Sequence, residues 1–341
     1  MIIESLAPTR VDLAGGTLDI WPLYLFHNNS QTINFAINCY ARCRVTPWRG
    51  QSIELISRDL ELRETFSSLA ALKQDIANKK RLRLLLLARL VLAFEPPGGL
   101  TIETTSGSPV GAGLGGSSAL NIAVCGALSR FSGRKLPRPK LIELARNIEA
   151  QVLGVPAGEQ DYYSAMYGGV QAIRLLPQGV RPEKLPVDNR TLSERVVLCY
   201  TGQSRNSGIN NWEVMKAHID GDRSVVRQFD RIAAIATEMR QALEEADWNG
   251  VARLIRLDWE ARKKNYPGIT TRLIDRLVLV ARRHGSFAAK ACGAGGGGCV
   301  LFLVKPEAKP RIERALEAEG VRVIPLKVAS RGLQVSSTPQ F

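Results

Sequence analysis

The chain has 341 residues, of which 45% are hydrophobic and 23% charged, so it can form one large globular domain or two medium ones. Its 46 basic and 32 acidic residues leave a net charge of +14, which favours anionic partners such as nucleotides, sugar phosphates, nucleic acid or an acidic membrane face. Aromatic residues make up only 6%, which argues against a long platform for stacking single-stranded bases.

Cysteine, histidine and hydropathy patterns exclude further classes. The six cysteines are scattered without a CxxC pair, as expected for buried thiols in a reducing cytoplasm. The three histidines, His27, His218 and His284, are far apart in sequence, which disfavours a His/Cys metal centre or a His-dependent hydrolase. The N-terminus lacks a secretory signal, and the most apolar stretch, residues 84–94, is too short to span a bilayer. We expect a soluble cytoplasmic protein in which this stretch is a core helix, the alternative being an amphipathic helix on a membrane surface.

The first third of the chain predicts strands, then a helix. Residues 32–47 are rich in β-branched and apolar side chains, and residues 51–56 alternate apolar with polar ones, which is typical of strands. Residues 69–94 predict one helix and residues 100–104 a short strand.

A glycine-rich segment follows and stops at Ser117 or Ser118, where a helix of small and apolar residues begins. Residues 140–153 then place apolar side chains on one stripe of a helix. Glu149 lies at the flank of that stripe, along the edge of the core. A short helix is expected over residues 161–166, with Asp161 at its N-terminus.

The second half of the chain predicts a further α+β unit. Strands are expected over residues 169–176, 195–201, 287–292, 299–304 and 321–328, and helices over residues 222–247, 248–265, 270–284 and 306–319. A strand–helix–strand ending behind a helical middle indicates a second domain, and the change of domain is expected near residues 190–205.

Two glycine clusters point to phosphate binding. The first contains Gly111, Gly113, Gly115 and Gly116, and the second extends from residue 293 to residue 298. A glycine loop that leads into a helix presents free N–H groups and the positive end of the helix dipole. The first loop lacks the lysine of a P-loop and the βαβ frame of a dinucleotide fingerprint.

Three blocks, in the same order along the chain, resemble the motifs of the GHMP kinases, the superfamily of galactokinase, homoserine, mevalonate and phosphomevalonate kinases. Residues 109–119 (PVGAGLGGSSA) are similar to the family's phosphate loop. Residues 7–19 (APTRVDLAGGTLD) resemble its N-terminal substrate motif, and residues 290–299 (KACGAGGGGC) resemble its C-terminal glycine motif. The resemblance therefore extends over essentially the whole chain.

This resemblance implies an α+β fold of two domains with the active site between them. Residues 1–195 would form an N-terminal domain similar to domain 2 of ribosomal protein S5, and residues 196–341 a ferredoxin-like C-terminal domain. It also implies that ATP binds to the first glycine loop, at Pro109, Gly111, Ala112, Gly113, Leu114, Gly115, Gly116, Ser117 and Ser118.

Family roles extend to the catalytic groups. The resemblance assigns Mg²⁺ binding to Ser117 and Glu149, with Ser118 as the alternative serine, and assigns Asp161 as the base that faces the acceptor hydroxyl. A hard ion such as Mg²⁺ takes one or two protein oxygens beside phosphates and waters, which suits a serine and a glutamate. Phosphoryl transfer needs positioning and charge neutralisation more than a strong base. Arg10 would then keep Asp161 ionised or stabilise the phosphoryl oxygens.

The resemblance also assigns substrate contacts, to Arg10, Gly16, Thr17, Asp19, Asp161, Gly295 and Gly296. Gly16 and Thr17 replace the Glu–His pair of galactokinases, whereas residues 200–207 and 265–269 look more like heptose 7-phosphate kinases and fucokinase-type enzymes. We expect an ATP- and Mg²⁺-dependent kinase of a sugar anomeric hydroxyl, acting as a monomer or homodimer without nucleic acid or membrane.

Other interpretations remain open at this point. A kinase of a neutral sugar, as in galactokinases and fucokinases, or of a mevalonate-type alcohol fits the same motifs. A non-enzymatic nucleic-acid-binding protein would fit the net charge and the S5-like half, although the low aromatic content and the full set of kinase positions oppose it.

Overall fold

Two long antiparallel strands, β1 (Ile2–Ala14) and β2 (Gln31–Pro47), form the centre of the computed structural model, which describes residues 1–203, 207–265 and 267–339. An irregularity in their pairing at Pro8 and Thr9 divides β1 into two parts. Ile3 and Ala7 pack into one core, whereas Val11 and Leu13 pack into another. The second part of β1 therefore packs into the core that also contains residues of the second half of the chain.

The first sheet has eight strands among the described residues, with the order β12-β1-β2-β5-β3-β4 and the β6–β7 hairpin attached to β2. Its pairs are antiparallel except β3 with β5. The further strands are β3 (Ile53–Ser57), β4 (Leu62–Phe66), β5 (Leu100–Ser106), β6 (Val170–Leu176), β7 (Gly179–Lys184) and β12 (Gln334–Thr338).

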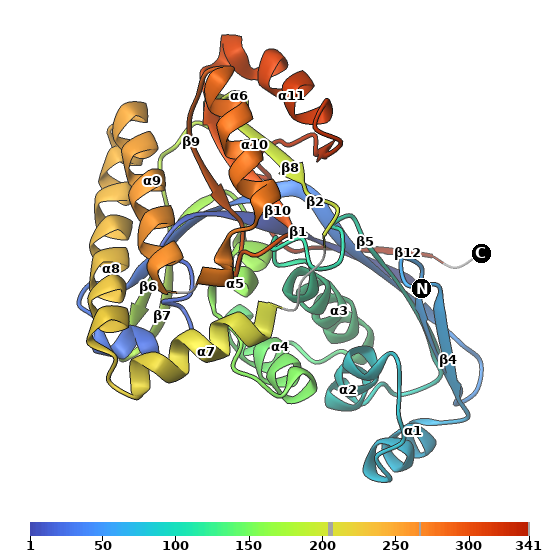
Figure 1. The fold of residues 1–341 in the computed structure, drawn as a ribbon. Coiled ribbons are helices and arrows are strands. Elements are labelled where there is room, and N and C mark those ends of the chain that lie inside the picture. Colours follow the sequence, from blue (N-terminus) through green and yellow to red (C-terminus); the bar gives the residue numbers. More distant parts are fainter. Residues whose placement is uncertain (204–206, 266, 340–341) are drawn as a thin grey trace.

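Helices cover one face of this sheet (Figure 1). They are α1 (Leu69–Ala77), α2 (Leu85–Phe94), α3 (Gly116–Ser132), α4 (Arg138–Leu153) and α5 (Gln160–Tyr167). The helix α3 lies at the centre of the core because its small and apolar residues, from Ser118 to Leu128, are almost all buried. This close packing of a small-residue helix on the sheet fixes where the glycine loop before α3 ends.

The second sheet has the order β11-β8-β10-β9, and every pair in it is antiparallel. Its strands are β8 (Val196–Tyr200), β9 (Ser286–Ala291), β10 (Cys299–Val304) and β11 (Arg322–Val323). With helices between the first and second and between the third and fourth strands, this is the split βαβ order of the ferredoxin-like fold, so the predicted C-terminal fold is confirmed.

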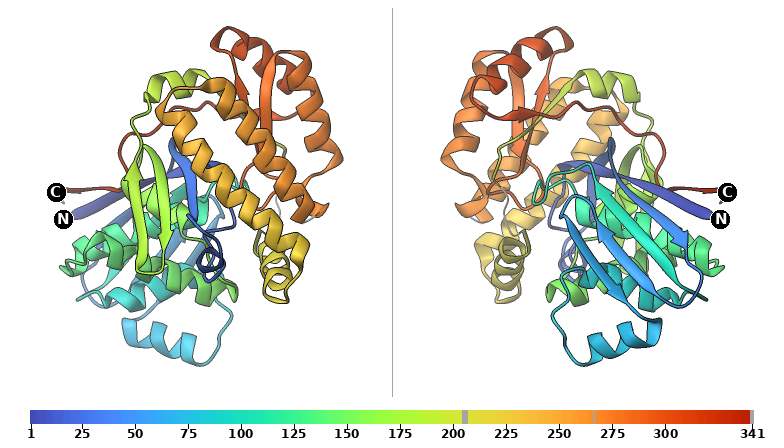
Figure 2. Two further views of the ribbon diagram at one scale, coloured as in Figure 1. Left: turned by 90° about the vertical axis from the view of Figure 1, so that its left-hand side faces the viewer. Right: turned by 90° about the vertical axis from the view of Figure 1, so that its right-hand side faces the viewer.

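The helices of the second half are α6 (Asn189–Glu194), α7 (Ser207–Ile219), α8 (Arg223–Glu244), α9 (Trp248–Asn265), α10 (Arg272–Arg283) and α11 (Lys309–Glu317). The long pair α8 and α9 runs beside the second sheet and also packs against β1 and β2 (Figure 2). None of the helices in the described ranges has the length and apolar character that crossing a membrane requires.

The structure corrects several sequence predictions. The single helix predicted over residues 69–94 is two helices, because Asn78 ends α1 and Lys79 adopts a left-handed φ of +54°. Of the strand predicted over residues 321–328, only Arg322 and Val323 pair with β8, and Val328 forms an isolated bridge with Ile37 of β2. No range was predicted for the strands β1, β4, β7 and β12 or for the helix α6.

The strand β12 bears on the expected division of the chain. Residues 196–341 were predicted to form the second domain, but β12 lies at the edge of the first sheet and pairs with β1 from Ile2 to Leu6. The two ends of the chain therefore lie side by side (Figure 2). Apart from β12, the strands of the first sheet lie within residues 2–184 and those of the second sheet within residues 196–323.

Candidate active site

A cavity of about 600 Å³ opens between the N-terminal end of α3 and the loop that joins β9 to β10. All the residues predicted to bind ATP lie on its wall, together with the predicted residues Arg10, Gly16, Thr17, Asp19, Glu149 and Asp161. These side chains come from β1, from the loop after it, from α4 and from α5. The fold thus gathers at one place nearly all the positions that the three motifs indicated.

The loop before α3 turns sharply at three glycines. Gly111, Gly113 and Gly115 have φ angles of +69°, +75° and +68°, a region that favours glycine. The helix α3 then begins at Gly116 with no side chain capping its N-terminus. Its first N–H groups and the positive end of its dipole therefore face the cavity, which is the arrangement that binds phosphate.

The second glycine cluster supports this loop from behind. The N–H of Cys299 donates to the carbonyl oxygen of Ala112 over 2.8 Å, and a Cβ atom on Gly298 would lie 2.7 Å from that oxygen. A Cβ atom on Gly293 would similarly lie 2.9 Å from Cα of Gly113. Glycine is required at these positions because the two backbones approach too closely for a side chain.

Gly295 and Gly296 do not occupy the positions predicted for them. The N–H of Gly296 donates to the carbonyl oxygen of Ile269 over 2.6 Å, and a Cβ atom on Gly295 would lie 2.5 Å from the same oxygen. Gly293 and Ala294 line the cavity in their place. The glycine cluster therefore turns away from the cavity halfway along its length.

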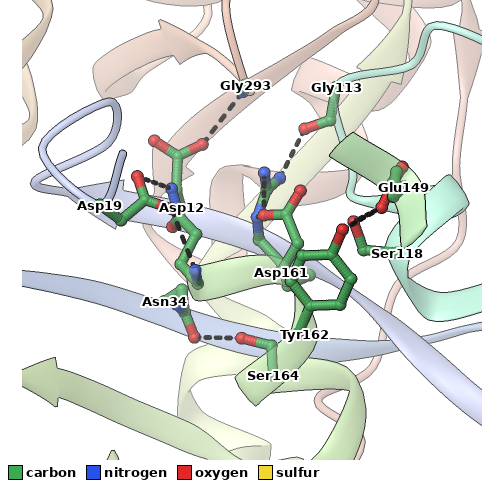
Figure 3. Close-up of polar contacts among 12 residues, drawn as sticks. Asp12, Asp19, Asn34, Gly113, Ser118, Glu149, Asp161, Tyr162, Ser164 and Gly293 are labelled. Atoms are coloured by element: carbon green, nitrogen blue, oxygen red, sulfur yellow. Dashed lines mark hydrogen bonds and ion pairs between the residues drawn. The ribbon is translucent and has the colours of Figure 1, made fainter. Parts of the chain in front are cut away.

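Asp161 and Arg10 form an ion pair at the centre of the cavity wall. Nε and Nη2 of Arg10 lie 2.7 and 2.6 Å from Oδ1 of Asp161, and Nη1 donates to the carbonyl oxygen of Gly113 over 2.6 Å. Arg10 is buried, whereas the side chain of Asp161 is 24% exposed and lies in the first turn of α5 (Figure 3). One guanidinium thus joins the carboxylate to the phosphate loop.

Glu149 lies on the other side of Asp161 from Asp12 and Asp19, next to Ser118 at the start of α3 (Figure 3). Its Oε2 accepts hydrogen bonds from the hydroxyl of Ser118, over 3.1 Å, and from the hydroxyl of Tyr162. Burial raises the pKa of Glu149, and hydrogen bonds from Ser117 and Tyr162 oppose that rise. A buried carboxylate and two serine hydroxyls therefore form a group of hard oxygen donors beside the loop.

Asp19 faces the cavity from the loop after β1, and it too is buried. Its Oδ2 accepts from the backbone N–H of Gln160 over 3.0 Å, and its Oδ1 accepts from Nε2 of the same residue over 3.3 Å. Burial and the nearby charge of Asp161 raise the pKa of Asp19 to about 6. Beside it, Thr17 has a φ of +78°, and a Cβ atom on Gly16 would lie 3.0 Å from Oδ2 of Asp12.

Beneath the cavity lies a buried group of charges that joins the two halves of the chain. Nζ of Lys290 lies 2.8 Å from Oδ2 of Asp12 and 2.6 Å from Oδ2 of Asp258. Arg262 completes the group, 3.5 Å from Asp12. Burial alone would raise the pKa of Asp12. Attraction to Lys290, Arg262 and Arg10 instead holds this pKa far below its usual value. Oδ1 of Asp12 accepts from the N–H of Gly293, so this group also fixes the second glycine loop (Figure 3).

Sequence reasoning gave no role in the site to Asp12, Gln160, Tyr162, Lys290 and Ala294, and it named Gly293 only as part of the second glycine cluster. The alternation of β1 was available as a signal, because Arg10 and Asp12 are two positions apart and so share a face of the strand. Residues 204–206 and 266, which belong to the segments that resemble heptose 7-phosphate kinases, lie outside the described residues.

Two family profiles match the chain. The profile described as the N-terminal domain of GHMP kinases matches residues 80–169, which include the phosphate loop, Glu149 and Asp161. The profile described as the C-terminal region of GHMP kinases matches residues 239–322, which include the second glycine cluster.

Whole-chain comparisons agree. The chain is 29% identical, over 93% of its length and 94% of the relative's, to D-glycero-alpha-D-manno-heptose 7-phosphate kinase of Campylobacter jejuni. It is 30% identical to mevalonate kinase of Thermococcus sibiricus over 71% of each chain. The crystal structure of galactokinase of Lactococcus lactis, at 19% identity, superposes with a TM-score of 0.81 over 98% of this chain and 95% of that one, which supports the fold.

The donor follows from the family, whose members take the transferred phosphoryl group from ATP. Three observations agree on the family: the two matching profiles, the relatives that match across both domains, and the glycine loop that faces the cavity at α3. The chain belongs to the GHMP kinase family and is an ATP-dependent phosphotransferase.

Proposed function

We propose that the protein transfers the γ-phosphoryl group of ATP to the anomeric hydroxyl of a sugar, with a heptose 7-phosphate as the preferred acceptor. The observation that carries the proposal is the position of Asp161, whose carboxylate lies against the phosphate loop and opens to the same cavity as Asp19. A hydroxyl group held beside Asp161 would therefore also lie beside the phosphates of ATP.

The binding of ATP and Mg²⁺ falls to the loop and to α4. The N–H groups at the start of α3 would bind the phosphates, and Ser117, Ser118 and Glu149 would supply oxygen ligands for Mg²⁺. When bound, Mg²⁺ neutralises the charge that develops on the phosphoryl oxygens. The donor set fits this ion, because the side-chain atoms in it are hydroxyl and carboxylate oxygens.

The acceptor hydroxyl is positioned by Asp161 and Arg10. Asp161 would accept the hydroxyl proton as the oxygen attacks phosphorus, and Arg10 keeps the carboxylate in place through two contacts to Oδ1. Because phosphoryl transfer passes through a loose transition state, orientation matters more here than the strength of the base.

The preference for a sugar rests on charge and similarity. Asp19, like Asp161, presents a carboxylate to the cavity, and its oxygens would accept hydrogen bonds from the hydroxyl groups of a sugar. The heptose 7-phosphate kinase of Campylobacter jejuni is similar over both domains. The net charge of +14 favours an acceptor that already carries phosphate.

The cysteine thiols support a cytoplasmic location. The six cysteines are free, and burial raises the pKa of Cys43 and of Cys292 to about 12, so both stay as protonated thiols. Free buried thiols together with an ATP requirement support a place in the reducing cytoplasm.

A panel of acceptors tests the proposal. ADP release would be measured with D-glycero-D-manno-heptose 7-phosphate, the corresponding heptose, L-fucose, D-galactose and mevalonate, each with ATP and Mg²⁺. We expect the highest kcat/KM with the heptose 7-phosphate and a product whose new phosphorus couples to the anomeric proton in NMR. A higher kcat/KM with mevalonate, or a phosphate on another hydroxyl, would overturn the proposal.

A further inference from the structure

Gln160 holds a buried hydrogen-bond acceptor that the protein leaves unused. The residue is 5% exposed, lines the cavity next to Asp161, and its side-chain oxygen Oε1 has no hydrogen-bond partner. A buried polar oxygen without a partner costs about 1–3 kcal/mol, so such an atom on the wall of a binding cavity indicates a ligand group that completes it.

The orientation of this amide is fixed by its neighbour. The amide nitrogen Nε2 donates to Oδ1 of Asp19, which as a carboxylate has no proton to donate. Reversing the amide would set Oε1 of Gln160 against that carboxylate oxygen, two acceptors facing each other. The nitrogen therefore faces Asp19, and Oε1 remains available on the other side of the amide.

Asp19 is held in the same way. Its two carboxylate oxygens each accept one hydrogen bond from Gln160, through the backbone N–H and through Nε2. Each of these oxygens can accept a further hydrogen bond. Gly158 leaves the space for this arrangement, because a Cβ atom there would lie 2.4 Å from Oδ2 of Asp19.

We propose that Asp19 and Gln160 form a paired recognition element for two neighbouring hydroxyl groups of the acceptor, one donating to the Asp19 carboxylate and the other to Oε1 of Gln160. The inference rests on the proposed function and deepens it. It names the acceptor class as a sugar with two adjacent free hydroxyls close to the one that is phosphorylated. Gln160 is thus a specificity-determining residue, beside a carboxylate that the family resemblance already indicated.

A purely structural role for Gln160 makes a different prediction. If Gln160 only holds Asp19 in position, its replacement would slow the reaction of every acceptor by the same factor. If Oε1 of Gln160 accepts a hydrogen bond from an acceptor hydroxyl, the replacement would slow the reaction only for acceptors that carry that hydroxyl. Removing the side-chain oxygen and removing the hydroxyl would then be equivalent changes.

The test is a double-mutant cycle between the protein and the acceptor. The monodeoxy analogues of the best sugar acceptor would be assayed with the natural sequence, with Gln160→Met and with Asp19→Asn. Loss of one hydrogen bond is expected to lower kcat/KM about tenfold. We expect one deoxy position to couple with residue 160 and a neighbouring position to couple with residue 19, so that the combined losses are far less than multiplicative.

Gln178→Met provides the matched control, because Gln178 is exposed on the turn between β6 and β7 and does not line the cavity. Its profile across the deoxy analogues should equal that of the natural sequence. Thermal unfolding and ATP affinity would show that Gln160→Met is folded.

The outcomes separate the two proposals. Multiplicative losses between Gln160→Met and every deoxy position would overturn the role of Gln160 while leaving a sugar kinase intact. Turnover of no sugar at all would instead overturn the proposed function. If Gln160→Met does not fold, the natural sequence still tests the pair, because indifference to every deoxy position but one would contradict a paired element.

Discussion

A Cβ atom on Gly115 would lie 2.9 Å from Cγ of Asp161 and 3.0 Å from its Oδ2. The glycine loop and the carboxylate of Asp161 are therefore in direct contact, although the loop ends at the N-terminus of α3 and Asp161 lies in α5. The φ of +68° at Gly115 and the absence of its side chain are both needed for this contact. In the proposed mechanism, this glycine would therefore set how closely the acceptor hydroxyl approaches the phosphates of ATP.

Gly115→Ala should inactivate the enzyme by moving Asp161. The methyl group would overlap the Asp161 carboxyl, and a displacement of about 1 Å at a catalytic group can cost about 100-fold in rate. We expect kcat to fall by at least about that factor. Steady-state ADP release, with the sugar acceptor saturating, is the measurement.

Gly133→Ala is the matched control for Gly115→Ala. Gly133 has a nearly equal φ of +70°, but a Cβ atom there has nothing within 4 Å. Both alanines suffer the same left-handed strain of about 1–2 kcal/mol, and Gly115→Ala adds the overlap with Asp161. Only Gly115→Ala should lose kcat, and equal kcat values for the two variants would contradict the role given to the contact.

Asp161→Asn should abolish sugar-dependent ADP release while leaving ATP binding nearly unchanged. An amide keeps the shape of the carboxylate but cannot take up the hydroxyl proton, and such a group typically contributes about 10²–10⁴-fold. ATP affinity should persist because the phosphate site is made by the loop and by the start of α3. Turnover measured beside calorimetric ATP binding checks both parts, and unchanged turnover would refute the base.

Glu149→Ala should raise the Mg²⁺ concentration needed for half-maximal activity. The variant removes a carboxylate ligand next to Ser118, while the phosphates and Ser117 would still hold the ion weakly. Glu143→Ala on the same helix serves as control, because Glu143 pairs with Lys140 at the surface. Identical Mg²⁺ titrations for the two variants would remove Glu149 from the metal site.

Local signals explain how much of the site was predictable from the sequence. The phosphate loop lies within a dozen residues, and its glycine spacing and the small-residue helix after it are both local. Glu149 and Asp161 followed from helix periodicity and family spacing, and both line the cavity. These residues could be found because the short sequence patterns that determine the local conformation also contain the residues that the chemistry requires.

Long-range contacts explain the rest. Gln160 becomes recognisable only beside Asp19, which is 141 residues away in the chain. In the sequence, Gly295 and Gly296 cannot be told apart from the glycines that contact the phosphate loop. Only the structure shows that they contact the carbonyl of Ile269 instead. The short strand β12 has no apolar run, and its pairing with β1 brings together the two ends of the chain.

Asp19→Asn should stabilise the protein above pH 6. The folded-state pKa of Asp19, about 6, lies above its ordinary value of 3.8, so the folded chain binds a proton between these values that the unfolded chain releases. The contribution of Asp19 to stability is therefore complete below about pH 4 and is lost as the pH rises through 6. At about 1.4 kcal/mol per pKa unit, the ionised form costs up to about 3 kcal/mol at pH 8.

Urea unfolding at pH 5 and pH 8 tests this prediction. The gain in the free energy of unfolding of Asp19→Asn over the natural sequence should be larger at pH 8. The same carboxylate should appear in the kinetics, because its protonation below about pH 6 removes hydrogen-bond acceptors for the sugar. The acidic limb of kcat/KM for the sugar near pH 6 should vanish in Asp19→Asn. A variant that is less stable at pH 8, or that keeps the limb, would contradict the assignment.

Lys290→Met should destabilise the whole chain, because it leaves the carboxylates of Asp12 and Asp258 buried without their shared cation. Breaking a buried ion pair from one side costs about 3–5 kcal/mol, and Arg262, at 3.5 Å from Asp12, compensates only one of the two acids. The midpoint of urea unfolding should fall accordingly. Arg190→Met, in an exposed ion pair with Glu194, is the control and should leave the midpoint in place. Equal midpoints for the two variants would show that the buried group does not hold the two halves together.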